Sequence, residues 1–185
     1  ALNTLAQWYG MTEPELTYAL TNLEAGGKLV VDPDGRIYAQ EGVEYNMVVP
    51  PPATAGTVDT STTFRLHSKP DARRTIALVF KNTELRDTRW NPGSGSISYK
   101  GFDIDDDSAT FSREEQLRIQ SIWKSVAEDF APFDVDVTTD NVPADRISRS
   151  NIADAEYGIQ VLVYTGGCER CSDAARAYLK SFSDI

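Results

Sequence analysis

The sequence predicts a mixed α/β chain of the α+β type, in which a small helix–helix–hairpin unit precedes a mixed, twisted sheet backed by one long helix. The first 45 residues combine helical spacing with a hairpin turn. A Pro-rich stretch follows, and the remainder alternates strand-like apolar runs with one long amphipathic segment. With 185 residues, 41% of them apolar, the chain is long enough for one domain plus a small appendage.

The N-terminal unit is predicted from local signals. Residues 2–9 place apolar side chains at helical spacing, and Thr12 with Glu15 forms a capping box that opens a second helix. Two β-type runs within residues 29–38 flank the turn sequence Asp-Pro-Asp-Gly, which indicates a hairpin. Two helices and a hairpin are also the elements of a DNA-binding winged helix.

The charge of the chain excludes nucleic acid as a partner. It has 28 acidic and 18 basic side chains, a net charge of -10, and a field of that sign repels phosphate backbones. The first 45 residues carry seven acids against Lys28 and Arg36, so a winged helix here would lack the basic surface of a DNA reader. No apolar run approaches the roughly 18 residues that span a bilayer, so we expect no membrane span.

The composition divides the chain into three parts. Residues 1–47 form the helix–helix–hairpin unit, and residues 48–63 are rich in Pro, Thr, Ala and Gly, which predicts an extended linker that buries little. Residues 64–185 form the second unit.

The second unit contains the strongest periodic signals. Ser112 and Glu115 form another capping box, followed by apolar residues at helical spacing until Pro132. Around this helix we expect a central apolar strand at 75–80, a Gly- and Ser-rich loop at 81–101, an alternating, half-buried strand at 133–138 and a strand at 157–165.

An acidic loop before the long helix is a candidate calcium site. Asp103, Asp105, Asp107 and Glu114 occupy positions 1, 3, 5 and 12 of a calcium-loop pattern, and short carboxylates at that spacing can surround a hard cation. Position 6 is Ser108, where a Gly is usual. An acidic helix entry without a cation is the alternative, because acidic residues are favoured near helix N-termini.

Cys168 and Cys171 form a C-x-x-C pair between the last predicted strand and a segment, 172–179, that has the composition of a helix. A local disulfide is the preferred interpretation. A redox motif is the second, but its fold needs further elements after the motif. Half of a metal site is the third.

His67 is the only histidine, so the chain alone cannot assemble a zinc site of two or three imidazoles. A surface or hydrogen-bonding role is expected for a lone His beside a linker, with a ligand role as the alternative.

One stretch of the chain resembles a known family. Residues 119–139, IQSIWKSVAEDFAPFDVDVTT, are similar to the first helix and following strand of secreted, reprolysin-like zinc metallopeptidases of the metzincin type. The resemblance extends over residues 64–182 and is supported by 64–70, 102–105, 110–112, 157–161 and the close Cys pair.

The resemblance implies a secreted proenzyme with residues 1–47 as its pro-segment. Its zinc would lie on a His-Glu-x-x-His-x-x-Gly-x-x-His helix beyond this chain, in the C-terminal half of the same protein, so no catalytic residue is carried over. We therefore expect this chain alone to be inactive, and the completed protein to hydrolyse peptide or protein substrates. The family's usual Asp and Gly are replaced at 79–82, which keeps open an alternative: a catalytically inactive, calcium-stabilised extracellular module.

Latency in such a proenzyme would require a block at the zinc. Neither Cys lies in the pro-segment, so a cysteine cannot be the blocking ligand. The remaining candidates are bulk alone or one of the side chains Glu41, Glu44, Asp59 and His67.

Overall fold

In the computed structural model, the described residues are 6–7, 11–21, 28–31, 36–41, 59–86, 88, 93, 95–164 and 175–178. The fold is mixed α/β, with small sheets and few helices. The chain divides into two compact units, one of residues 1–47 and 171–184 and the other of residues 48–170 and 185. No helix within the described residues is both long and apolar enough to cross a membrane.

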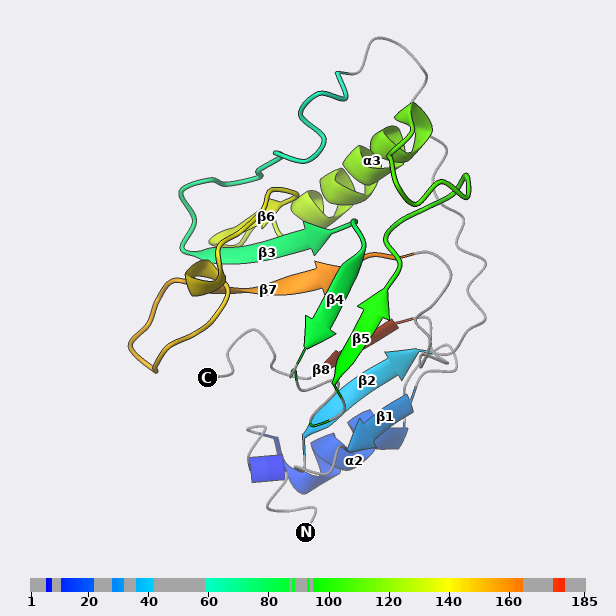
Figure 1. The fold of residues 1–185 in the computed structure, drawn as a ribbon. Helices are drawn as coiled ribbons and strands as arrows, with labels where there is room; N and C mark the ends of the chain where they lie inside the picture. Colours follow the sequence, from blue (N-terminus) through cyan, green and yellow to red (C-terminus); the bar gives the residue numbers. More distant parts are fainter. Residues whose placement is uncertain are drawn as a thin grey trace. The chain divides into compact units, whose positions relative to one another are not determined.

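The first unit contains the helix α2 (Glu13–Thr21) and the hairpin of β1 (Lys28–Val31) and β2 (Ile37–Glu41), drawn in blue in Figure 1. The predicted capping box is confirmed, because the backbone N–H and the hydroxyl of Thr12 donate to Glu15 Oε2 at 2.7 and 2.8 Å. Leu16 and Ile37 are fully buried, so the helix and hairpin share a small core.

A third strand, β8 (Ala175–Tyr178), joins this sheet antiparallel to β2, with Tyr38 opposite Tyr178. The helix expected over 172–179 is therefore wrong. Pairing with β2 provides hydrogen-bond partners for the main-chain groups on one side of the strand, and such tertiary pairing overrides a weak local propensity. The sheet thus joins segments that the predicted boundaries 1–47 and 64–185 placed in different units.

The second unit is built on a parallel sheet of β3 (Arg74–Val79), β6 (Val135–Thr138) and β7 (Tyr157–Leu162), in the order β6-β3-β7 (Figure 1). The prediction of a central apolar strand at 75–80 is confirmed, since β3 pairs with both neighbours. Gly158 is needed in β7 because a β-carbon there would collide with the carbonyl oxygen of Thr75.

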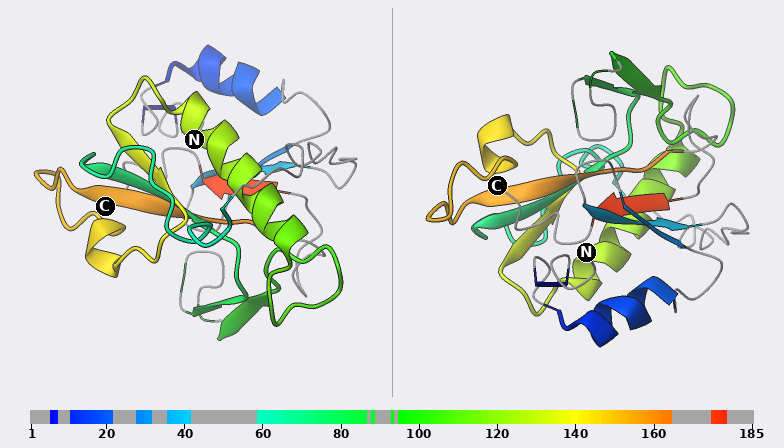
Figure 2. Two further views of the ribbon diagram at one scale, coloured as in Figure 1. Left: turned by 90° about the horizontal axis from the view of Figure 1, so that it is seen from above. Right: turned by 90° about the horizontal axis from the view of Figure 1, so that it is seen from below.

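The long helix α3 (Arg113–Asp129) lies across one face of this sheet (Figure 2). Its capping box is confirmed: Glu115 N donates to Ser112 Oγ, and Ser112 N donates to Glu115 Oε2 at 2.7 Å. Ile119 is fully buried, and Trp123 Nε1 donates to the Val137 carbonyl at 2.8 Å. These two side chains fix the helix to the sheet.

Two predictions for the second unit are wrong. The loop expected at 81–101 contains an antiparallel hairpin of β4 (Thr83–Arg86) and β5 (Ser96–Tyr99), in which Leu85 pairs with Ile97. The half-buried strand expected at 133–138 begins at Val135 and is buried on both faces, since Asp136, which the alternation placed toward solvent, is only 4% exposed. Phe133, which the alternation placed toward the core, lies before the strand and is 58% exposed. A short 3₁₀ helix, η2 (Ala144–Arg146), lies between β6 and β7.

The predicted linker 48–63 is wrong in its last five residues, and 48–58 lie outside the described part. Thr63 is fully buried, and its carbonyl accepts from Thr139 Oγ1 at 2.6 Å. Gln120 Nε2 donates to Asp59 O at 2.9 Å and to Thr63 Oγ1 at 2.8 Å. Hydrogen bonds from the hydroxyl and backbone N–H of Ser61 lower the pKa of Asp59. Residues 59–63 are therefore part of the second unit.

The capping box of α3 gives a stability prediction. Ser112→Ala removes the acceptor for the Glu115 N–H and should lower the free energy of unfolding by about 1 kcal/mol. Urea unfolding measured at one pH and temperature checks this value. Ser125→Ala, at an exposed position in the interior of the same helix, is the matched control. Equal effects of the two substitutions would contradict the capping role.

Candidate functional site

The acidic loop brings three carboxylates together. Single oxygens of Asp103, Asp105 and Glu115 all lie within 4.8 Å of one another. Of the four predicted calcium ligands, Asp103 and Asp105 belong to this group. The other two have different partners in the structure.

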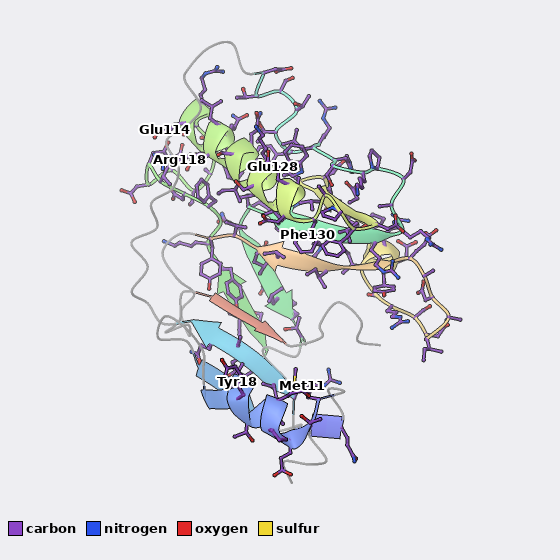
Figure 3. All side chains as sticks on the ribbon, turned by 180° about the vertical axis from the view of Figure 1, so that it is seen from behind. Met11, Tyr18, Glu114, Arg118, Glu128 and Phe130 are labelled. Atoms are coloured by element: carbon purple, nitrogen blue, oxygen red, sulfur yellow. The ribbon has the colours of Figure 1, made fainter. Side chains whose placement is uncertain are left out.

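Glu114 is not a member of the group. Its Oε1 accepts from Arg118 Nη2 at 2.8 Å, one turn further along α3, and Figure 3 labels both residues at this end of the helix. Asp107 accepts from Ala109 N at 3.2 Å and from Thr110 Oγ1 at 2.9 Å, so it stabilises the turn before the helix.

Glu115 takes the place that the spacing argument gave to Glu114. It is fully buried; its Oε1 accepts from Ile104 N at 2.9 Å, and its Oε2 accepts from Ser112 N. The capping box is the sequence signal that could have identified it, because the Glu of a capping box turns back over the helix N-terminus toward the preceding loop. All three side chains offer oxygen only, the ligand type that calcium and magnesium prefer.

The described residues do not form a catalytic zinc centre with three protein ligands. The only described group of three or more His, Cys, Asp or Glu that could hold a metal is this all-carboxylate group, whereas protein zinc sites are built mainly on imidazole and thiolate. Cys168 and Cys171 lie outside the described residues, so the disulfide, redox and metal interpretations of the pair stay predictions.

His67 forms a second polar cluster, beside β6. Its Nδ1 lies 2.6 Å from Oδ2 of Asp136, and the other oxygen of Asp136 accepts from Ser68 N at 2.9 Å and Lys69 N at 3.0 Å. The buried carboxylate therefore has three partners from one short segment, which satisfies a group that would otherwise be costly to bury.

The backbone around His67 is also fixed to β6. His67 forms an antiparallel bridge with Thr138, and Ser68 N donates to the Val137 carbonyl at 3.1 Å. The Ser68 hydroxyl accepts from Val137 N at 2.8 Å. His67 therefore lies in the second unit. Its predicted zinc-blocking role stays a prediction.

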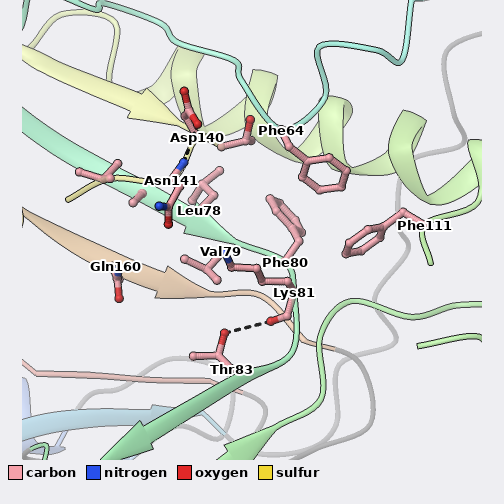
Figure 4. A pocket seen from close by; sticks show the side chains of 13 residues that line it. Phe64, Leu78, Val79, Phe80, Lys81, Thr83, Phe111, Asp140, Asn141 and Gln160 are labelled. Carbon is pink, nitrogen blue, oxygen red and sulfur yellow. Dashed lines mark hydrogen bonds between the residues drawn. The ribbon is translucent and has the colours of Figure 1, made fainter. Parts of the chain in front are cut away.

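A cavity of about 380 Å³ opens at the carboxyl ends of the parallel strands. Phe64 and Phe111, with ring centroids 4.8 Å apart, lie toward one end of it, and Asp140, Asn141 and Gln160 lie toward the other (Figure 4). Ligands of open α/β sheets bind outside the carboxyl ends of the strands. Sequence reasoning missed this cavity because its lining comes from segments far apart in the sequence, at 64, 77–83, 111, 139–142 and 160.

The network around Asp136 gives a second stability prediction. Asp136→Ala leaves the Lys69 N–H without its acceptor, removes one of the two acceptors of the Ser68 N–H and breaks the contact with His67, so it should lower the free energy of unfolding by about 3 kcal/mol. Asp134→Ala is the control, since Asp134 is exposed and its ion pair with Arg73 spans 3.5 Å; the loss there should stay below about 1 kcal/mol. Chemical denaturation of both variants measures these losses in the free energy of unfolding. Similar losses in the two variants would refute the role of Asp136.

Comparison of the chain with known protein families, with curated proteins and with solved structures found no match. The functional assignment therefore depends on the residues, their geometry and the resemblance noted in the sequence.

Proposed function

We propose that this chain is the pro-segment and the N-terminal half of the catalytic domain of a secreted zinc endopeptidase of the metzincin type. The observation that carries the proposal is the fold of residues 119–139, the stretch with the most specific resemblance. They form most of α3 and all of β6 and pack together, with Trp123 of the helix hydrogen-bonded to the Val137 carbonyl.

The same proposal accounts for the shortage of metal ligands. A chain with one histidine, whose Nδ1 already contacts Asp136, cannot hold a catalytic zinc by itself. The zinc helix would be contributed by the C-terminal half of the protein, where the metal supplies the activated water for peptide-bond hydrolysis. The described residues contribute a scaffold for that half.

The sheet also offers a place for an extended substrate. One edge, that of β6, is bridged by His67, whereas from Ile159 onward no described strand pairs with the outer side of β7. An extended peptide can add to such an edge through main-chain hydrogen bonds. We therefore assign substrate contact to the β7 edge, with the cavity at the ends of the strands close to the same sheet.

A second candidate function is a catalytically inactive, calcium-stabilised extracellular module with the same fold. The group of Asp103, Asp105 and Glu115 favours this candidate, because its donors suit a hard cation and require no zinc. A peptidase could also bind calcium in that loop. A measurement of catalytic activity, not of calcium binding, therefore distinguishes the peptidase from the inactive module.

The peptidase proposal predicts zinc and activity in the full-length encoded protein. After proteolytic removal of the pro-segment, it should contain one zinc per chain by elemental analysis and hydrolyse a denatured, fluorescently labelled protein. A zinc chelator should abolish the hydrolysis and added Zn²⁺ should restore it, whereas residues 1–185 alone should show none. A folded, processed protein that contains no zinc and hydrolyses no substrate would refute the peptidase proposal. The inactive, calcium-stabilised module would then be the remaining candidate.

The calcium loop gives a prediction that chooses between two neighbouring glutamates. With Ca²⁺ at about 100 times its dissociation constant, the free energy of unfolding of residues 1–185 should rise by about 2.7 kcal/mol. Glu115→Gln, which preserves a capping box, should remove most of this gain.

Glu114→Gln is the matched control and should retain the gain, because Glu114 pairs with Arg118 instead. If Glu114→Gln removed the gain and Glu115→Gln kept it, Glu114 would be the calcium ligand, as the spacing in the sequence predicts. If calcium does not change the free energy of unfolding of the unmodified chain, the loop is an acidic helix entry that binds no cation.

A further inference from the structure

The single imidazole of the chain lies between two carboxylates. Asp136 Oδ2 is 2.6 Å from His67 Nδ1, and Asp140 Oδ2 is 3.6 Å from His67 Nε2. The first contact is a short hydrogen bond, and the second is too long to be one. The two sides of the ring therefore have different chemistry.

The Asp136 side fixes the tautomer. An ionised carboxylate can only accept hydrogen bonds, and Asp136 is buried with its other oxygen already accepting from Ser68 N and Lys69 N. Nδ1 must then carry the hydrogen, and in the neutral ring Nε2 carries a lone pair. A buried carboxylate behind the distal nitrogen is the arrangement that orients metal-binding histidines and makes them more basic.

On the Asp140 side, the Nε2 lone pair of the neutral ring and a carboxylate oxygen, both hydrogen-bond acceptors, lie close together. The carboxylate is held in place, because its Oδ1 accepts from Asn141 N at 2.7 Å and its backbone N–H donates to Thr138 Oγ1 at 2.9 Å. In the neutral ring, the lone pair and the carboxylate oxygen at 3.6 Å repel each other, and either a proton on Nε2 or a metal ion between the two atoms turns this repulsion into attraction.

The separation suits a divalent transition metal. With Zn–N of about 2.0–2.1 Å and Zn–O of about 2.0–2.2 Å, tetrahedral geometry places the two ligand atoms about 3.4 Å apart. The observed separation of Nε2 and Oδ2 is 3.6 Å. Imidazole as a donor favours zinc over calcium or magnesium, which distinguishes this pair from the acidic loop.

We propose that His67 Nε2 and Asp140 Oδ2 bind a zinc-class divalent ion, with Asp136 as the positioning residue and water in the remaining positions. The proposal is independent of the proposed peptidase function, because both ligands belong to residues 1–185. It also concerns a different ion from the catalytic zinc, whose helix would lie in the C-terminal half.

The test uses residues 1–185 with excess Ca²⁺ present, so that the acidic loop is occupied by its preferred ion. Zn²⁺ is titrated at about pH 7.5 while the imidazole nitrogens are followed by long-range ¹H–¹⁵N NMR. We expect the Nε2 resonance of His67 to shift on addition of Zn²⁺ and to stay unchanged with Ca²⁺. Nδ1 should keep its hydrogen throughout.

Three variants locate the site. His67→Gln and Asp140→Asn should each weaken Zn²⁺ binding at least tenfold in calorimetry. Asp145→Asn, at an exposed position shortly after β6, should bind as the unmodified chain does. Because Asp140 is partly exposed and its change to Asn keeps the side-chain shape, this variant should stay folded, which circular dichroism verifies.

Two results would overturn the proposal. Zinc binding with no change at His67 Nε2, or with full affinity in both His67→Gln and Asp140→Asn, would place the ion elsewhere. An Nε2 that stays protonated at the highest Zn²⁺ concentration would show that a proton, not a metal, lies between the ring and Asp140. Neither result bears on the peptidase, whose activity is measured in the full-length protein.

Discussion

The buried carboxylate of Asp136 is the interaction on which the second unit depends. It lies on β6 in the parallel sheet and accepts hydrogen bonds from a segment about 70 residues earlier in the sequence. That segment leads directly into β3, the central strand, so one side chain sets where the chain enters the sheet. The cost of burying a charge is compensated only while all its partners are present, which makes this contact all-or-none.

The local part of the fold could be predicted from the sequence. Thr12 with Glu15 and Ser112 with Glu115 mark both helix starts, because a capping box is formed by residues only three positions apart. The central strand was predictable from its continuous apolar run. Signals of this kind depend on neighbours along the chain and need no knowledge of the tertiary structure.

The remainder depends on partners that are distant in sequence. Asp136 alternates with apolar residues, which predicts exposure, yet the backbone of Ser68 and Lys69 covers it. Residues 175–178 have no strong strand pattern and become a strand because β2 offers an edge. In the acidic loop, spacing selected Glu114, whereas the turn at the helix start directs its neighbour Glu115 into the group.

If residues 1–47 are a pro-segment, as proposed, the strand β8 affects how that segment could leave. Its four residues pair with β2, so the sheet of the first unit holds both an early and a late segment of the chain. A protease that cut between residues 47 and 59 would therefore leave two pieces still joined by main-chain hydrogen bonds. Departure of the N-terminal piece would then be a dissociation step, with a rate set by the opening of the β2–β8 pair. The same pairing means that this sheet cannot close during synthesis until residues 175–178 have been made.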